Sequence, residues 1–224
     1  TINDDINLIS KINNLFKADI IIVDLLLDNR EDYYKKLSSL SKTFIIDYFG
    51  GIEVYSDILL NWSIFEEDLL YKKKNPNTIF CLGQKYLLSR EEIGKYRNLD
   101  KKIEKNVKNV LITTGGGDRY NLIQRIINTL KDFNQIEFNI VVGSAAKNKD
   151  EIEYELKKNR LNYNIIENCN NLSELIYKAD LAISAGGMTC LELAAIGTPF
   201  LGFGMVVWET KRLKKLEELK ICNY

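Results

Sequence analysis

One stretch of the chain constrains its fold more than any other: residues 181–199, Leu-Ala-Ile-Ser-Ala-Gly-Gly-Met-Thr-Cys-Leu-Glu-Leu-Ala-Ala-Ile-Gly-Thr-Pro. The small apolar residues at 181–185 are typical of a parallel strand that is covered on both faces. Gly186 and Gly187 then predict a tight turn, at which a ligand can approach the bare backbone. The helix that follows is expected to end at Gly197, with Pro199 just beyond it. A strand, a glycine turn and a helix in this order are typical of an α/β fold.

The turn and the first helical residues have the features of a nucleotide site. A helix start offers unpaired N–H groups and the positive end of the helix dipole to an anion. Thr189 can cap this helix or donate its hydroxyl to a phosphate oxygen, and Glu192 can accept two hydrogen bonds from a ribose diol. The alternative is a structural turn with a solvent-facing Glu192, which its apolar neighbours disfavour. We therefore predict nucleotide binding by Gly186, Gly187, Met188, Thr189 and Glu192.

A second glycine turn follows an apolar strand expected at residues 108–114. Gly115, Gly116 and Gly117 leave room for a ligand and can present a nest of N–H groups. The alternative is a tight turn that only connects two elements. Asp118 is expected to cap the next helix rather than to react, and the whole turn is assigned to the nucleotide site.

From residue 108 onward, apolar strands alternate with amphipathic helices. Strands are expected at 108–114, 137–143, 163–167, 181–185 and from residue 200, and helices at 119–133, 150–159, 171–178, 189–196 and 208–220. Asn171 and Glu174 predict a capping box. This alternation predicts a parallel sheet with helices on both faces, with ligands bound beyond the carboxyl ends of its strands.

The first third of the chain has the pattern of another α/β domain. It contains a helix to about residue 16, a strand at 19–26, a helix at 30–40, and strands at 43–48 and 58–62. A free-standing sheet of this size buries little surface, so we expect that an N-terminal portion of the domain is absent. The polar link at 71–77 predicts a partial N-terminal domain over residues 1–77 and a nucleotide-binding domain over residues 78–224.

Several polar residues close apolar strands, where side chains often line a cleft. Asp24, Asp47 and Asn61 are predicted to contact the substrate for this reason. Gly204, which follows the last core strand, is predicted to approach it as well.

Composition excludes several classes of function. Lys plus Arg and Asp plus Glu number 31 each, so no charge excess points to nucleic acid or to a membrane surface. Histidine is absent, which excludes a Ser–His or Cys–His nucleophile in this chain. The four cysteines lack metal-ligand spacing, and no apolar run approaches ~18 residues. We expect a cytoplasmic protein with reduced thiols, without metal, cofactor or membrane span, and we name no catalytic base.

The pattern Ser-Ala-Gly-Gly-x-Thr-x-x-Glu-Leu-Ala-Ala-x-Gly-x-Pro at residues 184–199 resembles the nucleotide-binding motif of GT-B nucleotide-sugar enzymes. More closely, it is similar to the UDP-sugar hydrolase family of the pseudaminic acid pathway, a relative of the MurG glycosyltransferases. Residues 82–93 and 110–118 resemble two further segments of that family, and the strands of the first third follow in the same order. The resemblance covers the chain from about residue 15.

The resemblance implies a GT-B-like fold, with two Rossmann-like domains that have parallel sheets, the first of them incomplete here. It implies hydrolysis of the C1–O bond of a UDP-linked diacetamido-trideoxy sugar, in nonulosonic acid or surface polysaccharide biosynthesis. It places Tyr86 and Arg90 near the nucleotide, where the alternative is a plain helix start at residues 89–92. The family has a Tyr shortly after the Asp equivalent to Asp24 and an Asp-Asp pair where this chain has Asp47-Tyr48.

Two other functions stay open. A MurG-like glycosyltransferase would use the same UDP-sugar site, with a sugar hydroxyl in place of water. A non-catalytic binding subunit would complete its cleft with a partner chain or with the absent N-terminal segment. The family's water-activating residue is a His in an N-terminal glycine-rich loop, and this chain has no His. We therefore expect these residues to bind nucleotide better than they turn it over.

Overall fold

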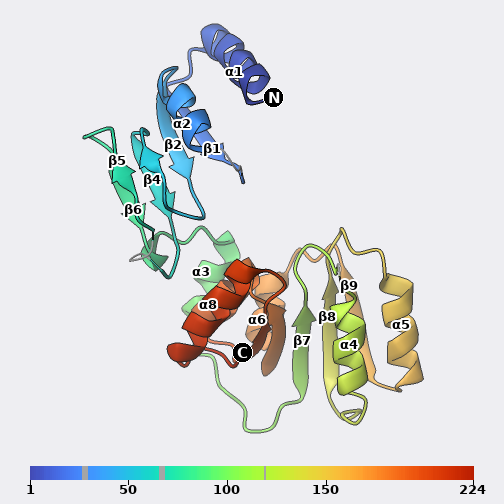
Figure 1. The fold of residues 1–224 in the computed structure, drawn as a ribbon. Coiled ribbons are helices and arrows are strands. Elements are labelled where there is room, and N and C mark those ends of the chain that lie inside the picture. The colour runs from blue at the N-terminus through green and yellow to red at the C-terminus, as the bar shows by residue number, and fades with distance from the viewer. Residues whose placement is uncertain (27–29, 66–68, 119) are drawn as a thin grey trace. The chain divides into compact units, whose positions relative to one another are not determined.

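The computed structural model describes residues 1–26, 30–65, 69–118 and 120–224. The chain divides into two compact units, Thr1–Leu88 and Ser89–Tyr224 (Figure 1). We predicted a boundary after residue 77. The structure places it later, because strand β6 (Ile79–Leu82) pairs with β4 (Ile58–Asn61) and so belongs to the first sheet.

The described part of the first unit holds a four-stranded sheet in the order β1-β2-β4-β6, with all neighbours parallel. Helices α1 and α2 pack against it through the apolar cluster around Val23, Leu37, Ile45 and Leu59. The remaining elements of this unit are α1 (Ile2–Phe16), β1 (Ile20–Asp24), α2 (Arg30–Ser38), β2 (Lys42–Ile46), the short pair β3 (Glu53–Val54) and β5 (Lys72–Lys73), and the 3-10 helix η2 (Gln84–Tyr86).

Helix α1 shows how local sequence produces the first unit. Thr1 and Asp4 form a capping box at its start, so two N–H groups of the first turn have acceptors. Ile2, Ile6 and Ile9 recur at helical spacing and pack against the core of the unit. The edge strand β1 pairs only with β2 in the described sheet, and its Ile20 and Ile22 are exposed.

The described part of the second unit holds a five-stranded parallel sheet in the order β11-β10-β7-β8-β9. The chain enters at the central strand β7, continues to β8 and β9 on one side, and then returns to β10 and β11 on the other. The strand order therefore reverses between β7 and β10. The bounds are α3 (Glu91–Arg97), β7 (Asn109–Thr113), α4 (Leu122–Thr129), β8 (Glu137–Val142), α5 (Lys149–Lys158), β9 (Asn162–Glu167), α6 (Leu172–Lys178), β10 (Leu181–Ala185), α7 (Met188–Ile196), β11 (Phe200–Phe203) and α8 (Val207–Glu218).

The core of the second unit explains why its strands are apolar on both faces. Val110 and Ile112 of β7 pack with Ile123 and Ile127 of α4. Leu111, which alternates with them along β7, is fully buried outside that cluster, since the opposite face is also covered. Helices α3, α6 and α7 pack against one another. The predicted α/β class with parallel sheets and alternating strands and helices is confirmed.

One predicted capping box and one predicted helix start differ from the structure. Helix α6 begins directly after Asn171 as expected, but the capping box is not formed, because Asn171 makes no side-chain capping hydrogen bond. Helix α3 begins within residues 89–92, at Glu91. The helix expected from residue 119 begins at Leu122, and residue 119 itself lies outside the described residues. Asn121 has a φ of 51°, a left-handed conformation that a helix cannot continue through.

Candidate functional site

The two glycine turns lie next to each other at one edge of the second sheet. β7 and β10 pair in parallel with Ser184 opposite Thr113, so both strands end at the same level. The turn of Gly115 and the turn of Gly186 leave the sheet there. The strand order reverses between these two strands, and in doubly wound sheets ligands bind in the crevice at that point.

The turn after β7 has open space around its first glycines. Gly115 has a φ of 81°, which glycine adopts without strain, and both Gly115 and Gly116 are exposed. A Cβ on either residue would meet no heavy atom within 4 Å. Gly143 of the next loop makes room for this turn, because a Cβ there would lie 2.3 Å from the Gly115 carbonyl oxygen.

Asp118 caps helix α4 from the end of the same turn. Its carboxylate accepts hydrogen bonds from the backbone N–H groups of Leu122, at 2.7 Å, and Ile123, at 3.2 Å. Asn148 Nδ2 donates to it from the neighbouring loop at 3.0 Å. Both oxygens of this buried carboxylate accept hydrogen bonds, so the predicted capping role of Asp118 is confirmed, and its contact with a nucleotide stays a prediction.

The turn after β10 leads directly into helix α7. Gly187 is the N-cap and makes no side-chain capping hydrogen bond, so Thr189 lies inside the helix and does not cap it. Of the two roles predicted for Thr189, capping is not formed, because the helix begins one residue before it, and the contact with a phosphate oxygen stays a prediction. The first-turn N–H groups of α7 therefore have no side-chain acceptor at the cap. The helix ends as predicted at Gly197, which has a φ of 82°.

Gly186 and Gly187 serve different purposes. A Cβ on Gly186 would lie 2.9 Å from the backbone oxygen of Glu209, so this glycine lets helix α8 pack directly on the turn. A Cβ on Gly187 would approach only Glu209 Oε1, at 3.8 Å, and otherwise faces open space. Gly204, which we predicted to approach the substrate, has a packing role too, since a Cβ there would lie 2.3 Å from Thr210 Oγ1.

Glu192 and Arg90, two predicted nucleotide residues far apart in sequence, form an ion pair. Glu192 lies one turn into α7 and is 2% exposed. Arg90 is the N-cap of α3, and its Nη1 donates to Glu192 Oε2. The Arg90 side chain is 48% exposed, so the pair combines a buried carboxylate with a cation that reaches solvent. Burial of a carboxylate needs such a partner.

Two charged residues of helix α8, Arg212 and Glu209, were not identified from the sequence. Arg212 Nη1 donates to the carbonyl oxygens of Gly186, at 2.9 Å, and Gly187, at 3.0 Å. Glu209 is buried, and its Oε2 accepts from the N–H of Met205 at 2.8 Å. Charged residues occupy most positions of α8, so no pattern in the sequence distinguishes these two.

Comparison with known proteins finds a family model that matches part of the second unit. Residues 109–211 match the family model described as "Glycosyltransferase family 28 C-terminal domain". The matched segment lies within the second unit. It contains β7, β10 and both glycine turns.

Two relatives match most of the chain. It is 31% identical over 211 residues to an uncharacterized protein of Methanocaldococcus jannaschii, covering 88% of this chain and 42% of that protein. It is 27% identical over 203 residues to the spore coat polysaccharide biosynthesis protein SpsG of Bacillus subtilis, covering 88% of this chain and 59% of that protein. The chain thus spans about half the length of the curated relatives it matches.

The fold is similar to that of a solved crystal structure. The crystal structure of MurG from Acinetobacter baumannii matches with a TM-score of 0.60 and 15% identity, over 96% of this chain and 61% of that chain. At this identity the likeness shows the fold alone. It confirms a GT-B-like architecture with parallel sheets.

The glycine turns of the second unit offer backbone binding groups rather than a reactive thiol. Cys190 is buried beside them, and burial raises its pKa to about 11, so the thiol stays protonated at neutral pH.

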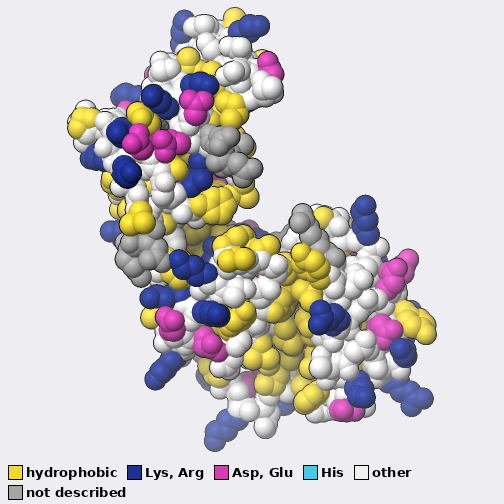
Figure 2. Space-filling view, viewed as in Figure 1, with side chains coloured by type: hydrophobic (Ala, Val, Ile, Leu, Met, Phe, Trp, Pro, Cys, Tyr) yellow, Lys and Arg dark blue, Asp and Glu magenta, His cyan; other side chains and the backbone are white. Residues whose placement is uncertain are grey.

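Among the described residues, no group of His, Cys, Asp and Glu side chains could hold a metal ion. None of the described helices is long and apolar enough to span a membrane. Basic and acidic side chains are interspersed on the face in view (Figure 2).

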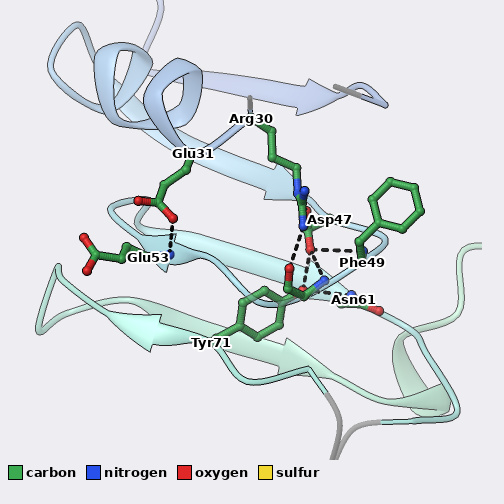
Figure 3. A network of polar contacts seen from close by, with 8 residues as sticks. Arg30, Glu31, Asp47, Phe49, Glu53, Asn61 and Tyr71 are labelled. Carbon is green, nitrogen blue, oxygen red and sulfur yellow. Dashed lines mark hydrogen bonds and ion pairs between the residues drawn. The ribbon is translucent and has the colours of Figure 1, made fainter. Parts of the chain in front are cut away.

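In the first unit, Asp47 lies at the centre of a buried polar network (Figure 3). Its Oδ1 accepts from Arg30 Nε at 2.7 Å. Its Oδ2 accepts from the Tyr71 hydroxyl at 2.7 Å and from the Gly50 N–H at 2.8 Å. Burial and the Asp47 charge raise the pKa of Tyr71 above its usual range. Both carboxylate oxygens are occupied, so Asp47 stabilises the unit, and its predicted substrate contact stays a prediction.

The other predicted residues of the first unit are also engaged within it. Asn61 donates from Nδ2 to the Tyr71 hydroxyl at 2.8 Å and is buried. Asp24 is exposed, accepts from the Tyr48 hydroxyl at 2.6 Å, and lines a hollow of about 450 Å³ beside α1 and α2. Tyr86 belongs to η2, so the structure places it in the first unit, while Glu192 and Arg90 lie in the second.

The two glycines of the α7 turn give a first prediction. Gly186→Ala should lower the free energy of unfolding of the second unit by about 1–3 kcal/mol, because the new methyl group forces α8 away. Gly187→Ala should change it by less than about 0.5 kcal/mol. Urea unfolding in a Trp62→Phe background, where Trp208 alone reports on the second unit, measures both values. Equal losses for the two variants would contradict the packing role of Gly186.

The Asp47 network gives a second prediction. Asp47→Asn should destabilise the first unit by about 3 kcal/mol, because it leaves the buried Arg30 cation without its counter-charge. Asp32→Asn, which removes an exposed ion pair with Lys36 on α2, should cost less than about 1 kcal/mol. Trp62 fluorescence in a Trp208→Phe background follows unfolding of this unit. A loss for Asp47→Asn no larger than that of the control would show that the network carries little stability.

Proposed function

We propose that the second unit binds the nucleotide of a sugar nucleotide and that the protein is a UDP-sugar enzyme. One observation carries the proposal. At the switch point of the second sheet, two glycine turns, with open space at Gly115, Gly116 and Gly187, adjoin a helix start without a side-chain cap, and a buried carboxylate lies one turn into that helix.

The proposed diphosphate site is the start of α7. N–H groups at a helix start and the helix dipole attract anions without any metal. Open space at Gly187 lets phosphate oxygens approach the backbone, and the exposed Gly116 offers a further N–H group from the neighbouring turn. Negative charge that develops on the diphosphate when the glycosyl bond breaks would be stabilised there, by donors that are already in place.

The proposed ribose site is Glu192. An ionised carboxylate has about four lone-pair positions, and the described residues show one hydrogen bond to it, from Arg90. Capacity for the ribose diol therefore remains. Arg90 orients the carboxylate, while the exposed side of the Arg90 guanidinium leaves room for a ligand.

For the reaction itself, we propose cleavage of the C1–O bond of a UDP-linked diacetamido-trideoxy sugar by water, in the cytoplasm, to release UDP and free sugar. The resemblance of residues 184–199 to UDP-sugar hydrolases of the pseudaminic acid pathway supports this choice. The printed name of the Bacillus subtilis relative, a polysaccharide biosynthesis protein, is consistent with such a role. The alternative is glycosyl transfer from the same UDP-sugar, which the family 28 match favours.

The ribose role of Glu192 gives a third prediction. Wild-type chain should bind UDP with micromolar affinity and prefer it to CMP, GDP and ADP in isothermal titration calorimetry. Glu192→Gln should weaken UDP binding about 10- to 100-fold, because it replaces charge-assisted hydrogen bonds with neutral ones. Glu174→Gln, on the exposed surface of α6, is the matched control and should leave the affinity unchanged.

Two results would speak against the proposal. Failure of the wild-type chain to bind any of the four nucleotides would remove the nucleotide site. Equal UDP affinity for Glu192→Gln and wild type would contradict the assignment of Glu192 to the ribose, without contradicting the proposed diphosphate site. Release of UDP from a UDP-sugar in water, without any acceptor sugar, separates hydrolysis from glycosyl transfer.

A further inference from the structure

We propose that Arg212 is a positioning residue for the diphosphate: it orients and polarises the two peptide groups that begin the α7 turn. The inference rests on the proposed nucleotide site. It concerns a residue that contacts the backbone of that site from helix α8.

The contacts of Arg212 fix two consecutive peptide planes. Its Nη1 holds the carbonyl oxygens of Gly186 and Gly187. In a planar trans peptide, the C=O and the N–H of the next residue point in opposite directions. The N–H groups of Gly187 and Met188 must therefore point away from Arg212, and the open space at Gly187 leaves room for an anion beside them.

The charge of Arg212 also strengthens those donors. A cation bound to a carbonyl oxygen polarises the whole peptide group, so its N–H becomes a stronger hydrogen-bond donor. The stability of α7 does not explain this arrangement. A cation near a helix N-terminus opposes the helix dipole, which costs roughly 0.3–1 kcal/mol. A bound anion at the turn would reverse that cost.

The surroundings of Arg212 hold it in this position. The guanidinium lies over the ring of Trp208, one turn earlier on α8, at 4.8 Å from its centroid. The absence of a side chain at Gly186 lets α8 approach the turn closely enough for the contact. A lysine could supply the charge, but it has no planar group to lie on Trp208.

The test compares ligands with and without phosphate. NMR titration of wild type, Arg212→Gln and Arg212→Lys with UDP and with uridine gives dissociation constants from micromolar to millimolar. Arg212→Gln should weaken UDP binding about tenfold, because charge-assisted contacts at the turn are lost, and change uridine binding less than about twofold. Arg212→Lys should fall between wild type and Arg212→Gln for UDP. Lys214→Gln, an exposed residue of the same helix, should change neither constant.

A second readout follows the turn directly. UDP should shift the amide signals of Gly187 and Met188 in wild type, and these shifts should shrink in Arg212→Gln. If Arg212→Gln does not fold, as judged by circular dichroism, Arg212→Lys carries the same comparison of UDP with uridine.

Three results distinguish the outcomes. Unchanged UDP affinity in the folded Arg212 variants would overturn the inference. Equal loss of UDP and uridine affinity would also overturn it, because that pattern means general distortion of the site. If wild type binds neither ligand, the proposed nucleotide site fails, and the inference fails with it.

Discussion

The parallel pairing of β7 with β10 is the constraint on which the candidate site depends. It brings two turns from distant parts of the sequence to the same sheet edge. The chain runs from β7 toward β8 and β9, and from β10 toward β11, so the connections diverge at the carboxyl ends of these two strands, where doubly wound sheets bind their ligands. Every residue that we assign to the nucleotide within the second unit lies on these turns or on the helices packed beside them.

The glycines of this unit are present for different physical reasons. Gly115 has a left-handed backbone conformation, and Gly186 and Gly143 make room for a neighbouring helix or loop. Gly187 has neither constraint in the structure. Because neither the backbone conformation nor the packing requires a glycine at position 187, a bound ligand is the remaining explanation for its small size.

Two buried carboxylates, each paired with an arginine, show how burial alone fails to identify a binding residue. Asp47 and its partner Arg30 are both shielded from solvent, and both carboxylate oxygens accept hydrogen bonds within the unit. Glu192 has an equally buried carboxylate, but its partner Arg90 is half exposed. A saturated pair stabilises the fold, whereas a pair that reaches solvent through its cation can exchange partners with a ligand.

The sequence by itself determined the α/β class, the alternation of strands and helices from residue 108, and both glycine turns, because hydrophobic periodicity and glycine placement are local signals. It did not determine the capping hydrogen bonds of the helices, since capping depends on whether a side chain can reach a free N–H in three dimensions. It also assigned Asp47 and Asn61 to the substrate site because they end strands. In the structure, Asp47 accepts a hydrogen bond from Arg30, and Asn61 donates to the Tyr71 hydroxyl and accepts from the Ser63 N–H. Only the tertiary structure decided that Arg90 pairs with Glu192 and that Arg212 donates to the α7 turn, because contacts between distant residues depend on how the elements pack. Helix α8 contains many charged residues, and nothing in the local sequence indicates which of them has such a partner.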